Sequence, residues 1–111
     1  MNIDDLTRAM HDFVQDQDWY QPDSPRPQTS KNLAISLSIE AAEVLEHVQW
    51  TEKPGNLHKL AGELADVMLY LLQLASISGI NLEEAVLEKL RINAARKWDT
   101  ETKATEENNE D

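Results

Sequence analysis

The amino-acid sequence predicts an all-α protein whose protomer resembles a four-helix bundle. Apolar residues recur at helical spacing in four segments, and no stretch alternates between apolar and polar residues as a strand would. Proline-rich and glycine-containing breaks separate these segments. With 111 residues the chain is expected to form one domain. A domain of this length buries only a modest share of its surface alone, so association into an oligomer is also expected.

The first predicted helix covers Ile3–Gln17 and carries one apolar face, formed by Ile3, Leu6, Met10, Phe13 and Val14. The segment "QPDSPRPQTS" follows it and holds three of the four prolines, which predicts a loop. The other predicted helices cover Ser30–Trp50, Leu57–Ser78 and Leu82–Lys97. The turn "KPGN" separates the second helix from the third. In "SGIN", Gly79 is expected to end the third helix, Asn81 to cap the fourth, and Glu84 to complete a capping box.

Residues 1–98 are therefore expected to form the folded domain, and residues 99–111 an acidic, disordered tail. The net charge of −11 argues against a nucleic-acid polymer or an anionic membrane as the main partner. The absence of cysteine excludes disulfides and thiolate metal sites. The start "MNIDDLTRAM" does not resemble a signal peptide, and no apolar run approaches the roughly 20 residues that span a bilayer. These features predict a soluble, cytoplasmic protein.

Acidic residues interrupt the apolar surfaces of the second and third helices. Helical spacing places Glu40 and Glu43 on one narrow stripe with Ser36 and His47. The third helix is apolar around most of its circumference, and its polar stripe is formed by Lys59, Glu63, Asp66, Tyr70 and Gln73. One such pair of acids alone would most simply be a solvated helix edge. Two pairs on consecutive antiparallel helices predict instead that four carboxylates face one another.

Four carboxylates brought together without a cation repel one another, and their pKa values rise. A divalent cation removes this repulsion, and an all-oxygen ligand set suits Mg²⁺ or Mn²⁺ better than zinc. A di-iron site is the rival metal hypothesis, but it uses Glu-x-x-His pairs. His47 follows Glu43 by four residues, and the third helix has no histidine beside its acids. The predicted metal ligands are therefore Glu40, Glu43, Glu63 and Asp66.

The fourth helix carries basic and amide side chains on an inward face. Lys89, Asn93 and Arg96 share this face with Leu82, Ala85 and Val86. Long basic side chains can also extend to solvent from a buried stem, which is the simpler interpretation for Lys97 at the edge. For the other three together we predict phosphate binding, because acids, a metal ion and basic donors around one cavity are the components of phosphoryl chemistry.

Aromatic residues are scarce, so their positions are informative. Trp19 follows the first helix, Trp50 ends the second, and Tyr70 lies on the acidic stripe. A nucleobase can stack on such rings, although Trp19 and Trp50 can equally seal the ends of the bundle. We assign predicted base and sugar contacts to Trp19, Trp50, Tyr70 and Lys31. His11 and His58 are interpreted as surface histidines without a role.

The two acidic pairs, Glu40-x-x-Glu43 and Glu63-x-x-Asp66, resemble the ExxE…ExxD signature of the all-α, MazG-like nucleoside triphosphate pyrophosphohydrolases. The segments "DWYQ…KNLAISLSIEAAEVLEHVQW", "ELADVMLYLLQLA" and "AVLEKLRINAARKW" resemble the dCTP-pyrophosphatase-like branch of that family. The similarity covers roughly residues 3–98, and the proline-rich loop is longer than the family leads us to expect. The resemblance implies Mg²⁺-dependent cleavage between the α- and β-phosphates, giving a nucleoside monophosphate and pyrophosphate. It also implies homodimers or homotetramers.

In this interpretation the four acids hold the metal, and Glu40 orients or deprotonates the attacking water. The predicted function is house-cleaning hydrolysis of (deoxy)nucleoside triphosphates. The alternative is a non-catalytic helical interaction module with a regulatory or antitoxin-like role. The sequence leaves open the preferred base, a modified nucleotide as the true substrate, the number of metal ions, dimer against tetramer, and which carboxylate acts as the base.

Overall fold

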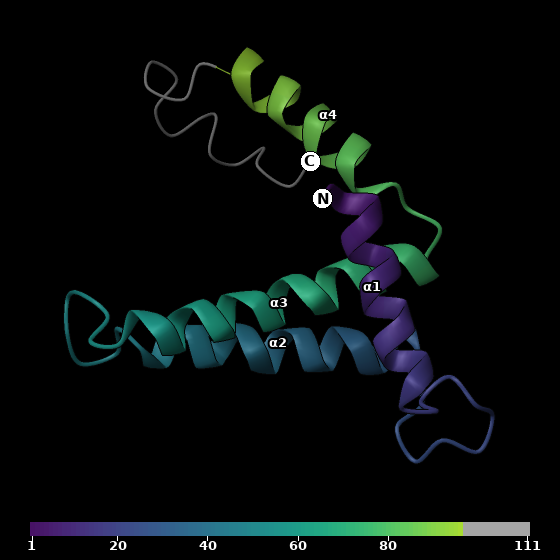
Figure 1. Ribbon diagram of the computed structural model, residues 1–111. Helices are drawn as coiled ribbons and strands as arrows, with labels where there is room; N and C mark the ends of the chain where they lie inside the picture. Colours follow the sequence, from purple (N-terminus) through teal and green to yellow (C-terminus); the bar gives the residue numbers. More distant parts are fainter. Residues whose placement is uncertain (97–111) are drawn as a thin grey trace. The chain divides into compact units, whose positions relative to one another are not determined.

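The structure is a computed structural model, and it describes residues 1–96. These residues form four helices and no strand: α1 (Ile3–Asp16), α2 (Ser30–Glu46), α3 (Leu57–Ile77) and α4 (Leu82–Ala95) (Figure 1). The all-α prediction is confirmed. The chain divides into two units, and the first, Met1–Ile80, contains α1, α2 and α3. The predicted tail at residues 99–111 lies outside the described residues.

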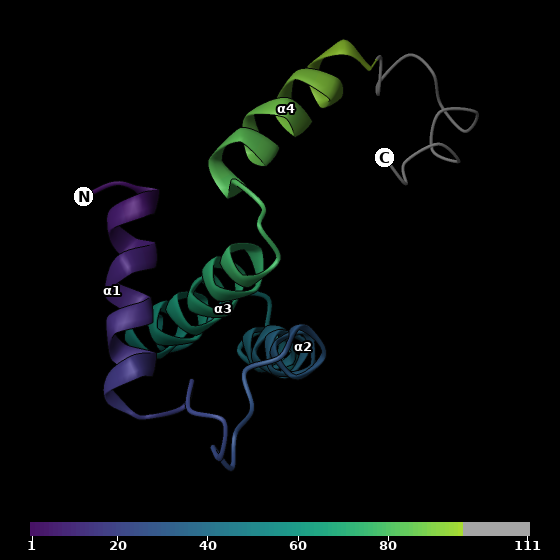
Figure 2. The same cartoon turned by 90° about the vertical axis from the view of Figure 1, so that its right-hand side faces the viewer.

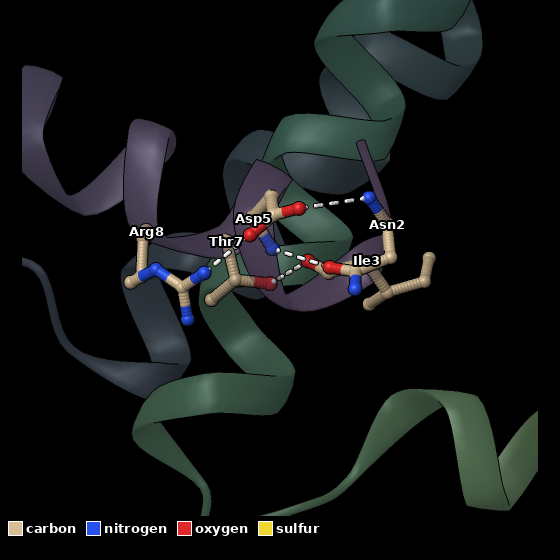
Figure 3. Close-up of polar contacts among 5 residues, drawn as sticks. All are labelled: Asn2, Ile3, Asp5, Thr7 and Arg8. Carbon is tan, nitrogen blue, oxygen red and sulfur yellow. Dashed lines mark hydrogen bonds and ion pairs between the residues drawn. The ribbon is translucent and has the colours of Figure 1, made fainter.

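Each helix begins at a side chain that caps its first turn. At α1, Asn2 accepts a hydrogen bond from the Asp5 backbone N–H at 2.8 Å, and Asp5 accepts one from the Asn2 backbone N–H at 3.2 Å (Figure 3). The same view shows Asp5 paired with Arg8. Caps of this kind satisfy backbone donors that have no partner within the helix. The N-cap residues of α2, α3 and α4 are Thr29, Asn56 and Asn81, the last as predicted.

The ends of the helices differ from the predicted bounds. Helix α2 was expected to reach Trp50 but ends at Glu46, because the chain turns at Val48, whose N–H bonds to the Leu45 carbonyl. Helix α4 ends at Ala95 rather than Lys97, because Arg96 adopts an extended backbone. Helices α1 and α3 each end one residue before the predicted position.

Two residues with positive φ form the turns that follow α1 and α3. After α3, Gly79 has φ 74°, and the Ile80 N–H bonds to the Ala75 carbonyl at 2.9 Å, which is the Schellman arrangement. After α1, Asp18 has φ 60° and is the one non-glycine residue with positive φ among residues 1–96. The Trp19 N–H then bonds back to the Val14 carbonyl at 3.2 Å. Both turns close tightly onto the helix that they end.

Helix α3 is the central element of the first unit. It runs antiparallel beside α2, and α1 crosses it near its C-terminal end (Figures 1 and 2). The buried apolar side chains come from all three helices and are Met10, Val14, Leu33, Leu72 and Ala75. Burial of apolar side chains where the three helices meet is the main stabilising contribution that this packing offers. Two residues of the loop 17–29, Tyr20 and Gln28, contact Gln73 of α3.

The expectation that no apolar run approaches the length of a bilayer span needs a correction for α3. By length and composition this helix is apolar enough to cross a membrane, with a mean hydropathy of 1.4 over 18 residues. The core helix of a soluble protein meets the same criterion. Helix α3 contacts both α1 and α2 and contributes Leu72, Gln73 and Ala75 to the interior. It also carries the carboxylates of Glu63 and Asp66, which are costly to place in lipid.

Candidate metal centre and the adjoining cavity

Three glutamates meet between α2 and α3. Glu40 and Glu43 lie three residues apart on α2, and the i, i+3 spacing puts both on the side facing α3. The antiparallel pairing brings Glu63 of α3 opposite them. One carboxylate oxygen from each residue lies within 4.8 Å of the other two, and all three side chains are half-buried. The structure therefore gathers three of the four acids that were predicted to form a metal site.

The environment of these acids disfavours their charged forms. Burial raises the pKa of Glu40, and the neighbouring charges of Asp66 and Glu63 raise it further. A hydrogen bond with Glu63 raises the pKa of Glu43, and the charge of Glu40 adds to this effect. His47 approaches the group from the last turn of α2, with its Nε2 at 3.6 Å from Glu63 Oε2. The three carboxylates are thus held together against their mutual repulsion.

The geometry fits a divalent cation. Glu40 Oε1 is buried and has no hydrogen-bond partner among the described residues, and a buried polar atom of this kind normally has one. An oxygen-rich set of hard ligands is what Mg²⁺ and Mn²⁺ prefer. A cation at this position would pair with the buried oxygen and remove the repulsion in one step. Glu40, Glu43 and Glu63 are the residues that could hold it.

Asp66 does not belong to the group of three oxygens. It lies one helical turn beyond Glu63 on α3, and its charge raises the pKa of Glu40. It also lines a cavity of the first unit. Asp66 therefore joins the acidic group to that cavity, and its role as a fourth metal ligand stays a prediction.

The cavity has a volume of about 430 Å³ and lies between α1, the start of α2, α3 and the intervening loop. Its apolar wall comes mainly from α1, with Leu33 of α2 and Leu69 of α3. Its aromatic and polar groups belong to Trp19, Arg26, Gln28, Asn32, Ser36, Asp66, Tyr70 and Gln73. An apolar enclosure of several hundred Å³ with a few converging polar groups is typical of a small-molecule site.

Two of the predicted base-binding aromatics line this cavity, Trp19 and Tyr70. Trp19 packs edge-on against Phe13, with ring centres 5.7 Å apart, and the Arg26 guanidinium lies 5.4 Å from the centre of its ring. Trp50 lies beyond the end of α2 and is 86% exposed. Lys31 is exposed in the first turn of α2 and is not part of the cavity wall. The structure brings together only the first two of these four residues.

The predicted phosphate-binding residues belong to the second unit of the chain. Lys89 and Asn93 are half-buried residues of α4, and Arg96 is the half-buried residue that caps its C-terminal end. Their assignment to phosphate stays a prediction.

Comparison with known proteins places this arrangement of helices and acids in a family. The model of the MazG-like family matches residues 35–111, which include Glu40, Glu43, Glu63 and Asp66. The chain belongs to the MazG-like family. Its solved structural neighbours include a pyrophosphatase from Archaeoglobus fulgidus DSM 4304, with a TM-score of 0.69 and 35% sequence identity. That match covers 81% of this chain and 86% of the other.

Curated relatives of this MazG-like chain include dCTP pyrophosphatase 1 from Homo sapiens, at 33% identity over 103 residues. The same protein from Rattus norvegicus is 31% identical over 103 residues. Each match covers 85% of this chain but 58% of the relative, so the chain spans about three fifths of the length of these relatives. The similarity extends over most of this chain and only part of theirs.

One group of residues in this MazG-like chain escaped the sequence-based reasoning. His11 was interpreted as a surface histidine without a role, and its hydrogen bonds were not foreseen. It is half-buried, with Nδ1 at 2.6 Å from Tyr20 Oη and Nε2 at 2.8 Å from Ser76 Oγ. Tyr20 in turn contacts Gln73, which contacts Gln28. The one sign of this group in the sequence was the position of Gln73 on the polar stripe of a mostly apolar helix. The sequence could not identify its partners, because they lie in a distant loop.

Proposed function

We propose that this chain hydrolyses (deoxy)nucleoside triphosphates to a nucleoside monophosphate and pyrophosphate, in a reaction that depends on a divalent cation and clears unwanted nucleotides. The observation that carries the proposal is the group of Glu40, Glu43 and Glu63, with one buried carboxylate oxygen lacking a partner, beside a cavity large enough for a nucleoside. The similarity to proteins named dCTP pyrophosphatase 1 and pyrophosphatase supports the same reaction.

Glu40, Glu43 and Glu63, with Asp66 as the predicted fourth ligand, are assigned to holding Mg²⁺ or Mn²⁺. When bound, such a cation neutralises charge on the triphosphate and lowers the pKa of a coordinated water. Glu40 is also the candidate general base, because burial raises the pKa of this carboxylate and so favours its acceptance of a proton. In the proposed step a water oxygen bonds to the α-phosphorus and its proton passes to Glu40. The bond from the α-phosphorus to the bridging oxygen breaks, and pyrophosphate leaves.

The cavity is the proposed site of the nucleoside. Trp19 and Tyr70 offer aromatic surfaces to a base, and the apolar residues of α1 exclude water from it. Asp66 on the wall connects this pocket to the acidic group, so a base in the cavity would leave its phosphates near the metal ligands. Contacts from Lys31 and Trp50, and phosphate contacts from Lys89, Asn93 and Arg96, remain predictions. It also remains a prediction that the protein forms a homodimer or homotetramer and lies in the cytoplasm. The same holds for the prediction that nucleic-acid polymers and membranes are not its partners.

The direct test is a screen of natural and modified nucleoside triphosphates with detection of released pyrophosphate. We expect release that requires Mg²⁺ or Mn²⁺ and stops on addition of a chelator, with the monophosphate as the second product. Release of inorganic phosphate in place of pyrophosphate would contradict the proposed bond cleavage. A protein that binds no divalent cation and releases no pyrophosphate would favour the alternative of a non-catalytic interaction module.

A further inference from the structure

Gln73 is the buried polar side chain of the core, at 3% exposure, and it lines the cavity. A buried amide is costly unless its groups are hydrogen-bonded. Its Nε2 donates to Gln28 Oε1 at 2.7 Å and to Tyr20 Oη at 3.2 Å. Both N–H groups of Gln73 are thereby used within the protein. The carbonyl oxygen is the group of this side chain that can still meet a ligand.

The orientation of the amide is fixed by a backbone carbonyl. Gln28 Nε2 lies 2.6 Å from the carbonyl oxygen of Arg26, which can only accept a hydrogen bond. The NH₂ group of Gln28 must therefore face Arg26, and its oxygen must face Gln73. An oxygen of Gln28 in that position requires the NH₂ group of Gln73 opposite it. The two amides are locked in one arrangement.

The second partner of Gln73 reinforces this lock. Because Tyr20 Oη accepts from Gln73, its own proton is free to be donated to His11 Nδ1 at 2.6 Å. His11 Nε2 can then donate to Ser76 Oγ at 2.8 Å, on the helix that carries Gln73. Burial raises the pKa of Tyr20, which keeps its hydroxyl protonated. Each hydrogen bond of this series thus has a fixed donor and acceptor, from Tyr20 in the loop through His11 of α1 to Ser76 of α3.

A glutamine that is free to rotate can offer a ligand either a donor or an acceptor. Rotating Gln73 by half a turn would break its bonds to Gln28 and Tyr20 and set its oxygen against the oxygen of Gln28. The loss of buried hydrogen bonds makes this arrangement unfavourable. Gln73 is therefore restricted to the role of an acceptor.

We propose that Gln73 is a specificity-determining residue, which selects nucleotides whose base presents an amino group to its carbonyl oxygen over those that present a carbonyl there. The inference rests on the proposed function in taking a nucleotide as the ligand of this cavity. The chemical pairs that test it are cytosine against uracil and adenine against hypoxanthine, since each pair exchanges an amino group for a carbonyl at one ring position.

The experiment measures dissociation constants for the monophosphates of each pair by titration calorimetry, and kcat/KM for the triphosphates in Mg²⁺. The Gln73→Leu variant removes the acceptor, and we expect the preference for the amino-bearing base to fall about tenfold, the effect of one hydrogen bond. The Gln28→Met variant keeps the acceptor but frees it to rotate. The preference of this variant for the amino-bearing base should be smaller than that of the wild type, because the carbonyl-bearing base should bind the variant more tightly. Gln49→Met, an exposed residue of the same unit, is the matched control and should behave as wild type.

The outcomes separate the inference from the proposed function. Equal affinity of the wild type for both members of each pair, or an unchanged ratio in both variants, overturns the role of Gln73 while leaving the hydrolase intact. Base-selective binding of monophosphates without pyrophosphate release supports Gln73 and overturns the proposed reaction. A wild-type protein that binds no nucleotide overturns both. If Gln73→Leu does not fold, judged by its helical circular dichroism, Gln28→Met alone decides.

Discussion

Glu40, Glu43 and Glu63 are three acids of like charge that the fold holds within 4.8 Å of one another. Such a group destabilises a protein unless something compensates it, because each carboxylate must lose water and face its neighbours. The fold accepts this cost, and acids with raised pKa values that are gathered in one place form a candidate functional site. The consequences can be measured in the protein without metal.

The first prediction concerns the stability of the metal-free protein as a function of pH. The pKa values of Glu40 and Glu43 are raised on folding, so the folded state binds their protons more tightly than the unfolded state. Stability is then highest below the ordinary glutamate range and falls as the pH rises through the raised values. We expect the Tm in chelator to decrease as the pH rises above about 4, the ordinary range of glutamate. Added Mg²⁺ should recover more of it at neutral pH than at acidic pH.

Other acids of this chain also repel one another and affect the dependence of Tm on pH. The contribution of the acidic group is therefore obtained by comparing a variant of this group with a variant of an exposed acid. Glu40→Gln should flatten the dependence of Tm on pH, whereas Glu52→Gln, an exposed acid of the loop after α2, should not. Equal slopes for the two variants, measured by thermal melts, would show that the acidic group does not govern this dependence.

The second prediction concerns turnover. Replacing Glu43, Glu63 or Asp66 with alanine should abolish Mg²⁺-dependent pyrophosphate release, because each removes an assigned ligand of the metal. Helix content should be unchanged, and the apo protein should melt at the same or a higher temperature as repulsion is relieved. Near-wild-type activity in one of these variants would falsify its assignment. Glu52→Ala provides the control for loss of one surface charge.

At the scale of single residues, the sequence predicted that Glu40, Glu43 and Glu63 lie together, but it did not predict the hydrogen bonds of Gln73. Helical periodicity is a local property, so it placed Glu40, Glu43 and Glu63 on facing stripes without knowledge of the fold. The contacts of Gln73 depend on Gln28, 45 residues away in an irregular loop. No periodic pattern describes such a loop, and the hydrogen bonds that fix it appear only in the folded structure.

Helix α4 is the element whose function depends most on the sequence-based argument. Its half-buried Lys89, Asn93 and Arg96 were predicted to bind phosphate, and its sequence lies within the match to the MazG-like family. Arg91, by contrast, is exposed and pairs with Glu88 on the same helix. The helix therefore contains both the residues to be tested and a matched control.

The third prediction is that Lys89→Ala and Arg96→Ala weaken triphosphate binding more than monophosphate binding. Loss of one charge-assisted contact costs about 1.5–3 kcal/mol. Titrations in Mg²⁺ with the Glu40→Gln variant as background would measure both ligands without turnover. Arg91→Ala should leave both affinities unchanged. Equal weakening for the two ligands would place these side chains at the α-phosphate or the sugar instead.

The C-terminal end of α2 shows that local hydrogen bonds, and not only the hydrophobic pattern, decide where a helix ends. The apolar pattern continues through Val48 and Trp50, so the sequence extended α2 to Trp50. The structure ends the helix at Glu46 and leaves Trp50 exposed in the loop. Local turn bonds decide this end, and a pattern of hydrophobic residues carries no information about them.

At the scale of the whole molecule, the main feature is apolar surface that the helices of the first unit do not cover. On α3, Leu64 and Leu69 are 51% and 43% exposed, and on α2, Ile35 and Ile39 are 49% and 54% exposed. Leu72 of α3, by contrast, is buried within the protomer. If these side chains form one patch, that patch is of the kind found at interfaces between subunits.

The fourth prediction is that the protein is a homodimer or homotetramer at micromolar concentration, with α3 at a subunit interface. Light scattering coupled to size exclusion would measure the mass. Leu64→Glu should shift the mass toward the monomer, because it places a charge in the apolar interface, whereas Glu52→Gln in the exposed loop should not. A stable and active monomer of the wild-type protein would contradict this prediction.

The left-handed backbone of Asp18 has a consequence for the evolution of this chain. Only glycine, and to a lesser degree asparagine and aspartate, adopt that conformation at small cost, and β-branched residues do so rarely. Among homologues that keep this turn, position 18 should therefore be restricted to these three residues, although it is exposed and lies outside the lining of the cavity. This restriction would reflect the backbone geometry that places Trp19 in the cavity wall, and a conservation score would mistake it for a chemical role.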